Sequence, residues 1–176
     1  MEIKINKAII RPVVETQDEL GRLLEIYREC EDFLALGPVA KASLEMVKAD
    51  LEHSRSEGGL YCSIVDPASG EMVGVVDFVP RGFQGKDSLA SLSLLMIAAR
   101  ERGKGLGEAV ARAVEAEITK DRRISAIDAG VQVNNPKAIR FWQRMGYQII
   151  SEPRTMPDGT VCFQLLKKIS RHGLGD

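Results

Sequence analysis

A glycine-rich turn between a strand-like segment and a helix-like segment is the feature that most constrains how this chain can fold. Residues 92–98 are almost wholly apolar, and the run Arg-Gly-Lys-Gly-Leu-Gly at 102–107 leads into a long helical pattern. Glycine adopts positive φ at little cost and lets the backbone approach a ligand closely. The free N–H groups and the dipole at a helix start attract anions. The sequence therefore predicts either a pyrophosphate site or a tight strand-to-helix connection.

The spacing of these glycines narrows the choice of phosphate ligand. A nucleotide P-loop places four residues between its glycines and then Lys-Ser or Lys-Thr, and the dinucleotide fingerprint is G-x-G-x-x-G. This chain has G-x-G-x-G at 103–107. Neither ATP nor NAD is therefore the expected ligand.

A second pattern follows at residues 134–147. Asn135 is a good N-cap, Pro136 is a favoured first helical residue, and apolar residues with helical spacing lead to Gly146, which can end the helix. A capped amphipathic helix before a strand needs no function to explain it. The information lies in the combination of this helix with the glycine-rich turn.

Together the two patterns resemble the GNAT superfamily of N-acetyltransferases. The shared order is strand, Arg-x-x-Gly-x-Gly, helix, strand, and then Asn-x-x-Ala-x-x-x-aromatic-x-x-x-Gly-aromatic, over residues 92–147. The resemblance implies an α/β fold of the α+β, mixed-sheet kind, ordered β-α-α-β-β-β-α-β-α-β-β. It also implies that the parallel strands at 89–98 and 124–133 splay apart to admit acetyl-CoA.

The remaining elements follow from local patterns, and Thr16 to Glu19 forms a capping box for the first helix. We expect a single domain over 1–170 with a C-terminal tail at 171–176. The predicted strands are 3–13, 60–66, 72–80, 89–98, 124–133, 147–152 and 161–168, and the last two flank a turn at 157–159. The predicted helices are 17–30, 40–55, one from the glycine turn to 120, and 136–145.

The resemblance assigns cofactor contacts residue by residue. They would be the backbone of Leu95, Met96 and Ile97 along pantetheine, then Arg102, Gly103, Lys104, Gly105, Leu106, Gly107 and Glu108 at the pyrophosphate, with Asn135 and Trp142 on the other side. It also implies direct attack of a primary amine on the thioester through a tetrahedral intermediate, whose oxyanion a backbone N–H on a bulged strand near Ile97 would stabilise. No covalent enzyme intermediate is expected.

The general base is ambiguous in the sequence, because the position where some family members carry a carboxylate is Gly130 here. Asp77 interrupts the apolar run 75–79, where an unpaired carboxylate is costly to bury. Asp128 interrupts the strand at 124–133 in the same way, and Asp32 belongs to an acidic cluster after the first helix. Each is a candidate base. The alternatives for Asp77 are a structural salt bridge or a strand-edge position, and the alternative for the acidic cluster with Asp32 is a solvated helix end.

Trp142 stands where many family members have a tyrosine that serves as general acid. An indole cannot protonate sulfur, so the coenzyme would leave as a thiolate, and Trp142 would pack against pantetheine or in the core. A noncatalytic acetyl-CoA-binding sensor is the alternative function, favoured only by the missing carboxylate at Gly130.

Composition limits the other partners. The formal net charge of −1 argues against binding to nucleic acid or to an anionic membrane. Three cysteines and two histidines without ligand spacing argue against a metal site, and no apolar run of membrane-spanning length occurs. We therefore expect a cytoplasmic protein. The resemblance implies that its acceptor is a small-molecule amine or a protein amino group. A homodimer through the edge of the C-terminal hairpin stays open.

Overall fold

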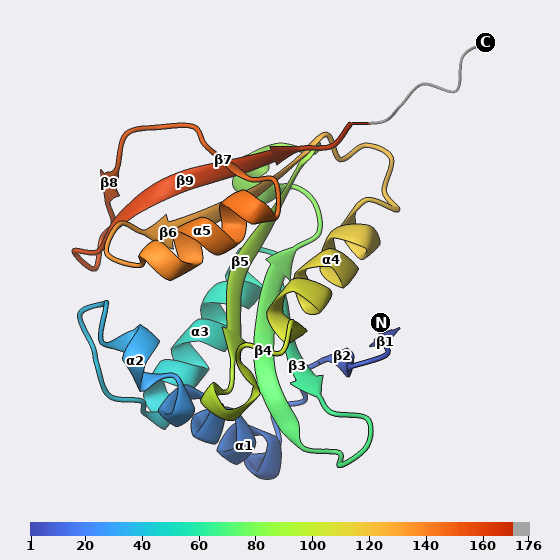
Figure 1. The fold of residues 1–176 in the computed structure, drawn as a ribbon, viewed down its shortest axis with the longest axis vertical. Helices are drawn as coiled ribbons and strands as arrows, with labels where there is room; N and C mark the ends of the chain where they lie inside the picture. Colours follow the sequence, from blue (N-terminus) through green and yellow to red (C-terminus); the bar gives the residue numbers. More distant parts are fainter. Residues whose placement is uncertain (171–176) are drawn as a thin grey trace.

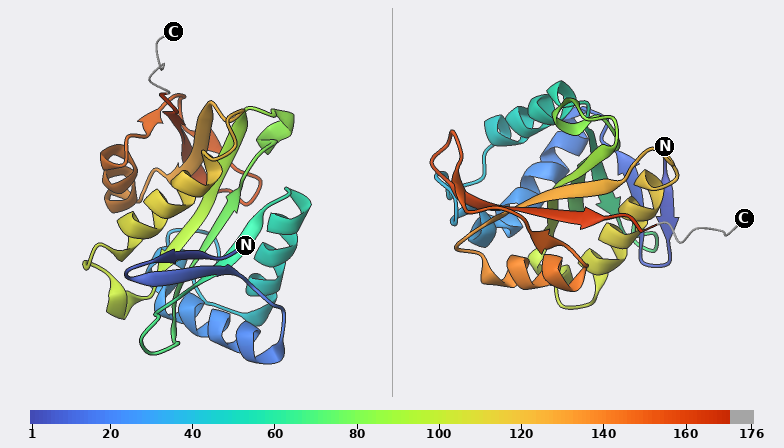
Figure 2. Two further views of the ribbon diagram at one scale, coloured as in Figure 1. Left: turned by 90° about the vertical axis from the view of Figure 1, so that its right-hand side faces the viewer. Right: turned by 90° about the horizontal axis from the view of Figure 1, so that it is seen from above.

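A twisted mixed sheet runs through the middle of the molecule, with helices on both of its faces (Figures 1 and 2). The structure is a computed structural model and describes residues 1–170 of 176, so the tail predicted at 171–176 lies outside the described residues. Helices α1 (Gln17–Glu29) and α3 (Leu44–Ser56) cover one face. Helices α4 (Leu106–Ile118) and α5 (Pro136–Arg144) cover the other.

A short helix, α2 (Glu31–Leu34), follows α1 along the chain. Short 3-10 turns occupy Phe83–Gly85 and Ala99–Glu101. The strands are β1 (Ile3–Ile5), β2 (Ala8–Pro12), β3 (Leu60–Val65), β4 (Met72–Val79), β5 (Leu89–Ile97), β6 (Ala126–Gln132), β7 (Gln148–Ile149), β8 (Arg154–Thr155) and β9 (Val161–Lys168).

The spatial order of the strands is β1-β2-β3-β4-β5-β6-β9-β7, and β8 also pairs with β9. Within the described chain, β5 and β6 form the parallel pair, and the other neighbouring strands run antiparallel. The predicted mixed α/β sheet with a parallel pair from 89–98 and 124–133 is therefore confirmed.

The parallel pair is joined along only half of its length. Pairing runs from Leu89 with Ala126 to Leu92 with Ala129. Beyond that point β5 continues to Ile97 against β4, and β6 continues to Gln132 against β9. The two strands therefore separate, which leaves the peptide groups on the facing edge of β5 without a strand partner.

A β-bulge in β5 lies where this separation begins. Asp77 of β4 faces Leu94 and the next residue, Phe78, faces Leu92, so Ser93 is the extra residue. Leu92 and Leu95 pack with the core beneath α4 and α5, whereas Leu94 packs with the core beneath α1 and α3. The bulge thus shifts the alternation of side chains between the two faces of the sheet.

Several predicted boundaries were wrong. The strand predicted at 3–13 is a hairpin, because the chain reverses at Asn6 and Lys7 and pairs Ile5 with Ala8. The strand predicted at 147–152 is shortened to β7, and Pro153, which has no N–H to donate, precedes the unpredicted β8.

The helical boundaries differ for local reasons as well. Helix α3 begins at Leu44 rather than at 40, because the Ser43 hydroxyl accepts from the Met46 N–H at 3.1 Å. Thr16 caps α1 as predicted, accepting from the Glu19 N–H at 3.2 Å. The capping box is incomplete, since the Glu19 carboxylate pairs with Arg11 at 2.9 Å instead of returning to the helix start.

Candidate active site

The glycine-rich turn has the backbone conformation that its sequence predicts. Gly103 and Gly105 have φ of +75° and +77°, which is the left-handed region. Gly105 is the N-cap of α4 and no side chain caps this helix. The first helical bond is the one from the Ala109 N–H to the Gly105 carbonyl at 3.1 Å. The N–H groups of residues 106–108 therefore remain available to an anion.

A cavity of about 460 Å³ lies against this turn, between β5, the start of α4 and one side of α5. Most of the predicted cofactor residues line it, namely Leu95, Ile97, Arg102, Gly103, Gly105, Leu106, Gly107, Glu108 and Trp142. We call it the α4–α5 cavity.

Three predicted cofactor residues do not line the α4–α5 cavity. Met96 pairs with Val75 of β4, so its peptide group faces into the sheet. Lys104 pairs with Glu101 at 3.1 Å. The Asn135 side chain caps α5 by accepting from the Ala138 N–H at 3.1 Å. Asn135 therefore fixes the start of the helix that carries one wall of the cavity.

Residues not singled out in the sequence complete the wall: Glu101, Ala138, Phe141 and Arg144. Ala138, Phe141 and Trp142 stand at i, i+3 and i+4, so the apolar spacing of the helix could have indicated them. Nothing in the local sequence indicated Arg144. Among residues 1–170 it has no ion pair, which leaves its charge available to the cavity.

Successive peptide groups of β5 point alternately toward β4 and toward this cavity. The Ala98 N–H donates to the Val73 carbonyl of β4 at 2.9 Å, so the peptide groups of Leu95 and Ile97 face the other way, into the opening. The Ile97 carbonyl is occupied, because it accepts from Arg102 Nε at 2.9 Å and from Cys30 Sγ at 3.4 Å. The bulge that the resemblance implied for this strand lies at Ser93.

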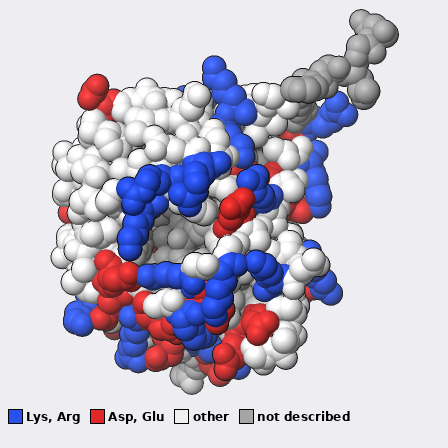
Figure 3. All heavy atoms as spheres, viewed as in Figure 1, with Lys and Arg blue, Asp and Glu red and all other residues white. Residues whose placement is uncertain are grey.

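Arg102 and Asp32 form a bidentate ion pair, with the two guanidinium nitrogens 2.6 and 3.1 Å from the two carboxylate oxygens. This pairing lowers the pKa of Asp32 and raises that of Arg102. The acidic cluster after α1 thus neutralises part of the basic turn. A hollow opens on the face shown in Figure 3, and Lys and Arg side chains lie along its upper and lower edges.

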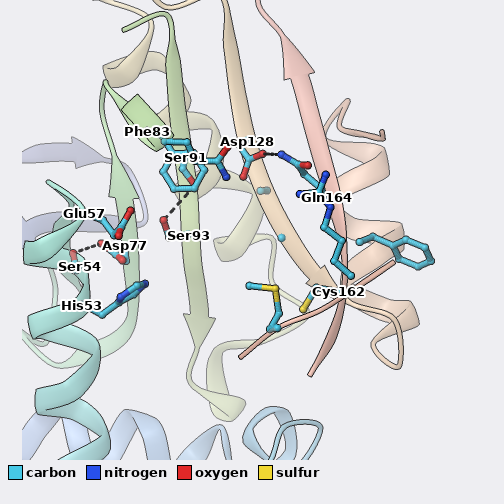
Figure 4. A pocket seen from close by; sticks show the side chains of 16 residues that line it. His53, Ser54, Glu57, Asp77, Phe83, Ser91, Ser93, Asp128, Cys162 and Gln164 are labelled. Carbon is cyan, nitrogen blue, oxygen red and sulfur yellow. Dashed lines mark hydrogen bonds between the residues drawn. The ribbon is translucent and has the colours of Figure 1, made fainter. Parts of the chain in front are cut away.

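A second cavity, of about 380 Å³, lies on the α3 side of the sheet, and we call it the α3 cavity. Figure 4 shows polar side chains facing it from successive elements of the sheet and from α3. They include His53 and Ser54 of α3, Asp77 of β4, Ser91 and Ser93 of β5, Asp128 of β6 and Gln164 of β9.

Asp77 is only 7% exposed and lines the α3 cavity beside the bulge. Its Oδ1 accepts from the Ser54 hydroxyl at 2.6 Å. Burial raises the pKa of this carboxyl above its usual range, with Ser54 acting in the opposite direction. Within residues 1–170 it has no ion pair, so the alternative of a structural salt bridge is wrong for Asp77.

Asp128 is 6% exposed and faces the same cavity from β6. It accepts from Gln164 Nε2 at 2.7 Å, and burial raises its pKa as well. The structure therefore places Asp77 and Asp128 in the lining of the same cavity and leaves Asp32 outside it, where Asp32 pairs with Arg102. Gly130 also lines this cavity, and a Cβ there would meet nothing within 4 Å.

Trp142 is both a core residue and part of the wall of the α4–α5 cavity. It is 7% exposed, and its ring meets those of Phe141 and Tyr147 edge-on, each at a centroid distance of 5.0 Å.

Other kinds of site find little support in the structure. Burial raises the pKa of the Cys30 thiol, which disfavours the thiolate that a nucleophile needs. Among the described residues no cluster of His, Cys, Asp and Glu could hold a metal ion, and none of their helices is long and apolar enough to cross a membrane.

A mixed sheet that opens between two parallel strands, with a glycine-rich turn before the helix that joins them, is the fold of an acyltransferase class. The sequence model described as "Acetyltransferase (GNAT) family" matches residues 21–147, and the chain therefore belongs to this family. A comparison with curated protein sequences gives no significant match.

Solved structures agree with this fold over almost the whole chain. An acetyltransferase from Thermus thermophilus is 23% identical with a TM-score of 0.74, and the match covers 96% of this chain and 100% of that one. AAC(6')-Ib in complex with ribostamycin and coenzyme A is 19% identical with a TM-score of 0.72, and the match covers 93% of this chain and 94% of that one. The NatC complex bound to Gag peptide and CoA is 12% identical with a TM-score of 0.65, and the match covers 93% of this chain and 99% of that one.

Proposed function

We propose that this protein is an acetyl-CoA-dependent N-acetyltransferase that acts on a primary amine. The observation that carries the proposal is the arrangement of two cavities along one strand. Residues 95 and 97 of β5 line the α4–α5 cavity, and residues 91 and 93 line the α3 cavity on the other face. The strands separate between them, so a thioester entering from one face can meet an amine entering from the other.

The α4–α5 cavity is suited to coenzyme A. The N–H groups at the start of α4 and the unpaired Arg144 would hold the pyrophosphate. The Leu95 carbonyl and the Ile97 N–H, left unpaired by β6, would bind pantetheine as an added strand. Two of the structural neighbours were solved with coenzyme A bound, which is consistent with this assignment.

Asp77 is the base that the geometry favours. It lies beside the bulge where β5 and β6 begin to separate, and its pKa is raised toward neutrality by burial. An alkylamine arrives protonated at neutral pH and must lose a proton before or during attack. The ammonium gives up one proton to solvent on binding, and Asp77 accepts the second, directly or through a water, as the amine nitrogen bonds to the acetyl carbon and the thiolate leaves.

The oxyanion formed on the acetyl group needs an N–H donor on the exposed edge of β5. Ile97 was the predicted donor, and its N–H does face the opening. Leu95 faces it too and lies two residues closer to Ser93 and the α3 cavity. We therefore assign the oxyanion to the Leu95 N–H and the pantetheine chain to Ile97. Thiolate departure needs no protonation by Trp142, because a thiol is a fair leaving group.

Replacing Arg144 tests the cofactor site without touching the acceptor cavity. Loss of a charge-assisted contact to phosphate costs about 1.5–3 kcal/mol, so Arg144→Gln should weaken coenzyme A binding about 10- to 100-fold. Calorimetric titration measures the affinity. Arg140→Gln, on the same helix but not lining the cavity, is the matched control and should bind as the wild type does. Equal affinity of both variants would contradict the placement of the pyrophosphate.

Thiol release from acetyl-CoA, followed with a thiol-reactive dye across a panel of amines, tests the function itself. Amine-dependent release together with a product heavier by one acetyl group is the expected result. Tight binding of coenzyme A with no release from any amine would favour the noncatalytic sensor. Absence of binding would overturn the cofactor assignment.

A further inference from the structure

Two buried carboxylates face the α3 cavity, and neither forms an ion pair within residues 1–170. Asp77 and Asp128 each accept one hydrogen bond from a neutral partner, Ser54 and Gln164. No lysine or arginine in the described chain forms an ion pair with either of them. Carboxylates this deeply buried are normally paired, so two unpaired ones in one cavity call for a ligand that pairs with both.

The two carboxylates stand at different ends of the cavity. Asp77 is on β4 and Asp128 on β6, with β5 between them. Neighbouring strands are about 4.8 Å apart, so the two backbones are separated by roughly 10 Å across the sheet. Figure 4 shows Ser91 and Ser93 in the interval between the two acids. The two acids are also offset along β5, since Asp77 lies opposite Leu94 and Asp128 opposite Ser91, so we do not expect one ammonium group to bond to both carboxylates.

We propose that the acceptor carries two amino groups, one that reacts beside Asp77 and one that stays protonated and is bound by Asp128. The proposal rests on the proposed function and names its substrate class: a compound with two ammonium groups joined by a short spacer. Ser91 and Ser93 offer hydroxyls between the two acids, and Phe83, Met156 and Phe163 offer apolar surface for the spacer.

The charge of the cavity lining favours this class over an amino acid. Glu57 joins the two aspartates in the lining, and Arg154 is the one lysine or arginine among the described lining residues. Arg154 is exposed and lies on the short edge strand β8. Burial raises the pKa of Asp128, and the Gln164 hydrogen bond and the charges of Lys86 and Arg154 act in the opposite direction without reversing this shift. A carboxylate on the acceptor would have to enter between three acids.

A comparison of matched amines tests the proposal. We expect kcat/KM for 1,4-diaminobutane to exceed that for 1-aminobutane about 10- to 100-fold, the value of one charge-assisted bond. A compound with two ammonium groups can be a linear diamine or an amino sugar. 2-Deoxystreptamine, a ring with two amino groups, distinguishes these, since a preference for it over the linear diamine indicates an amino-sugar acceptor. Equal rates for the monoamine and both diamines would overturn the proposal.

Asp128→Asn removes the proposed second contact. It should lower kcat/KM for the diamine by about 10-fold or more relative to its effect on the monoamine, because only the diamine uses that carboxylate. The control is Asp18→Asn, whose side chain is 76% exposed on α1 and far from the cavity. An equal loss for both amines would make Asp128 a structural or chemical residue and overturn its binding role.

Binding separates this proposal from the proposed function. If no amine releases thiol, the N-acetyltransferase assignment fails, and the question of the second ammonium is then answered by calorimetry with coenzyme A present. Tighter binding of 1,4-diaminobutane than of 1-aminobutane, lost in Asp128→Asn, supports the dicationic site. Equal binding of both amines overturns it.

Discussion

Asp77→Asn should reduce kcat about 10²- to 10⁴-fold while leaving coenzyme A binding unchanged, because a positioned general base contributes rate on this scale. Asparagine keeps the shape of the side chain and can still accept from Ser54, but it cannot take a proton from the amine. The initial rate of thiol release at saturating acetyl-CoA measures the loss of kcat, and calorimetry measures the affinity for coenzyme A.

Ser54→Ala is the matched variant for this effect. It removes the hydrogen bond at 2.6 Å that holds Asp77 but leaves the carboxylate in place, so a smaller loss of kcat is expected. A kcat within about threefold of wild type in Asp77→Asn lies far below the rate contribution of a general base and would exclude Asp77 from that role.

The pH profile gives an independent reading of the same carboxyl. Burial raises the pKa of Asp77 above that of an ordinary aspartate, which is about 3.9. As the pH falls, the active ionised form of Asp77 is therefore lost at a higher pH than an ordinary aspartate would be protonated. Activity should therefore rise with pH through this raised pKa. Asp50 raises that pKa further and His53 lowers it. In Asp77→Asn the acidic limb of log kcat should disappear.

The sequence indicated most of what is local in this site. The positive φ values at Gly103 and Gly105 and the cap at Asn135 follow from short patterns. Asp77 and Asp128 could be selected because each interrupts an apolar run, and both proved to be buried. These features depend on neighbouring residues in the chain, which is why a single sequence can reveal them.

What the sequence did not indicate depends on contacts between distant segments. The pairing of Asp32 with Arg102 joins residues seventy positions apart and removes Asp32 from the candidate bases. The bulge at Ser93 arises from the register of β4 against β5. Arg144 lines the α4–α5 cavity only because α5 packs beside β6. Such placements follow from tertiary packing, which periodicity does not encode.

Gly107→Asp should abolish high-affinity coenzyme A binding without weakening the fold. Gly107 is in the first turn of α4, and a Cβ there would sit 3.7 Å from Ile97 and 3.9 Å from Phe141, both ordinary contacts with walls of the α4–α5 cavity. The carboxylate would thus enter the space proposed for the pyrophosphate. Like charges held together at a binding site cost several kcal/mol, which corresponds to a loss of about 100-fold or more.

The stability of the unliganded variant distinguishes a blocked site from a damaged one. Replacing a helical glycine stabilises the folded state by about 0.5–1 kcal/mol, and an acidic residue in the first turn adds about 0.3–1 kcal/mol through the helix dipole. Chemical denaturation should therefore show no loss of unfolding free energy. Gly107→Ala keeps the N–H and adds only the methyl group, so it should bind coenzyme A nearly as well as wild type. If the aspartate and alanine variants bind equally, the anion does not lie at the start of α4, and the cofactor would have to enter the cleft in another orientation.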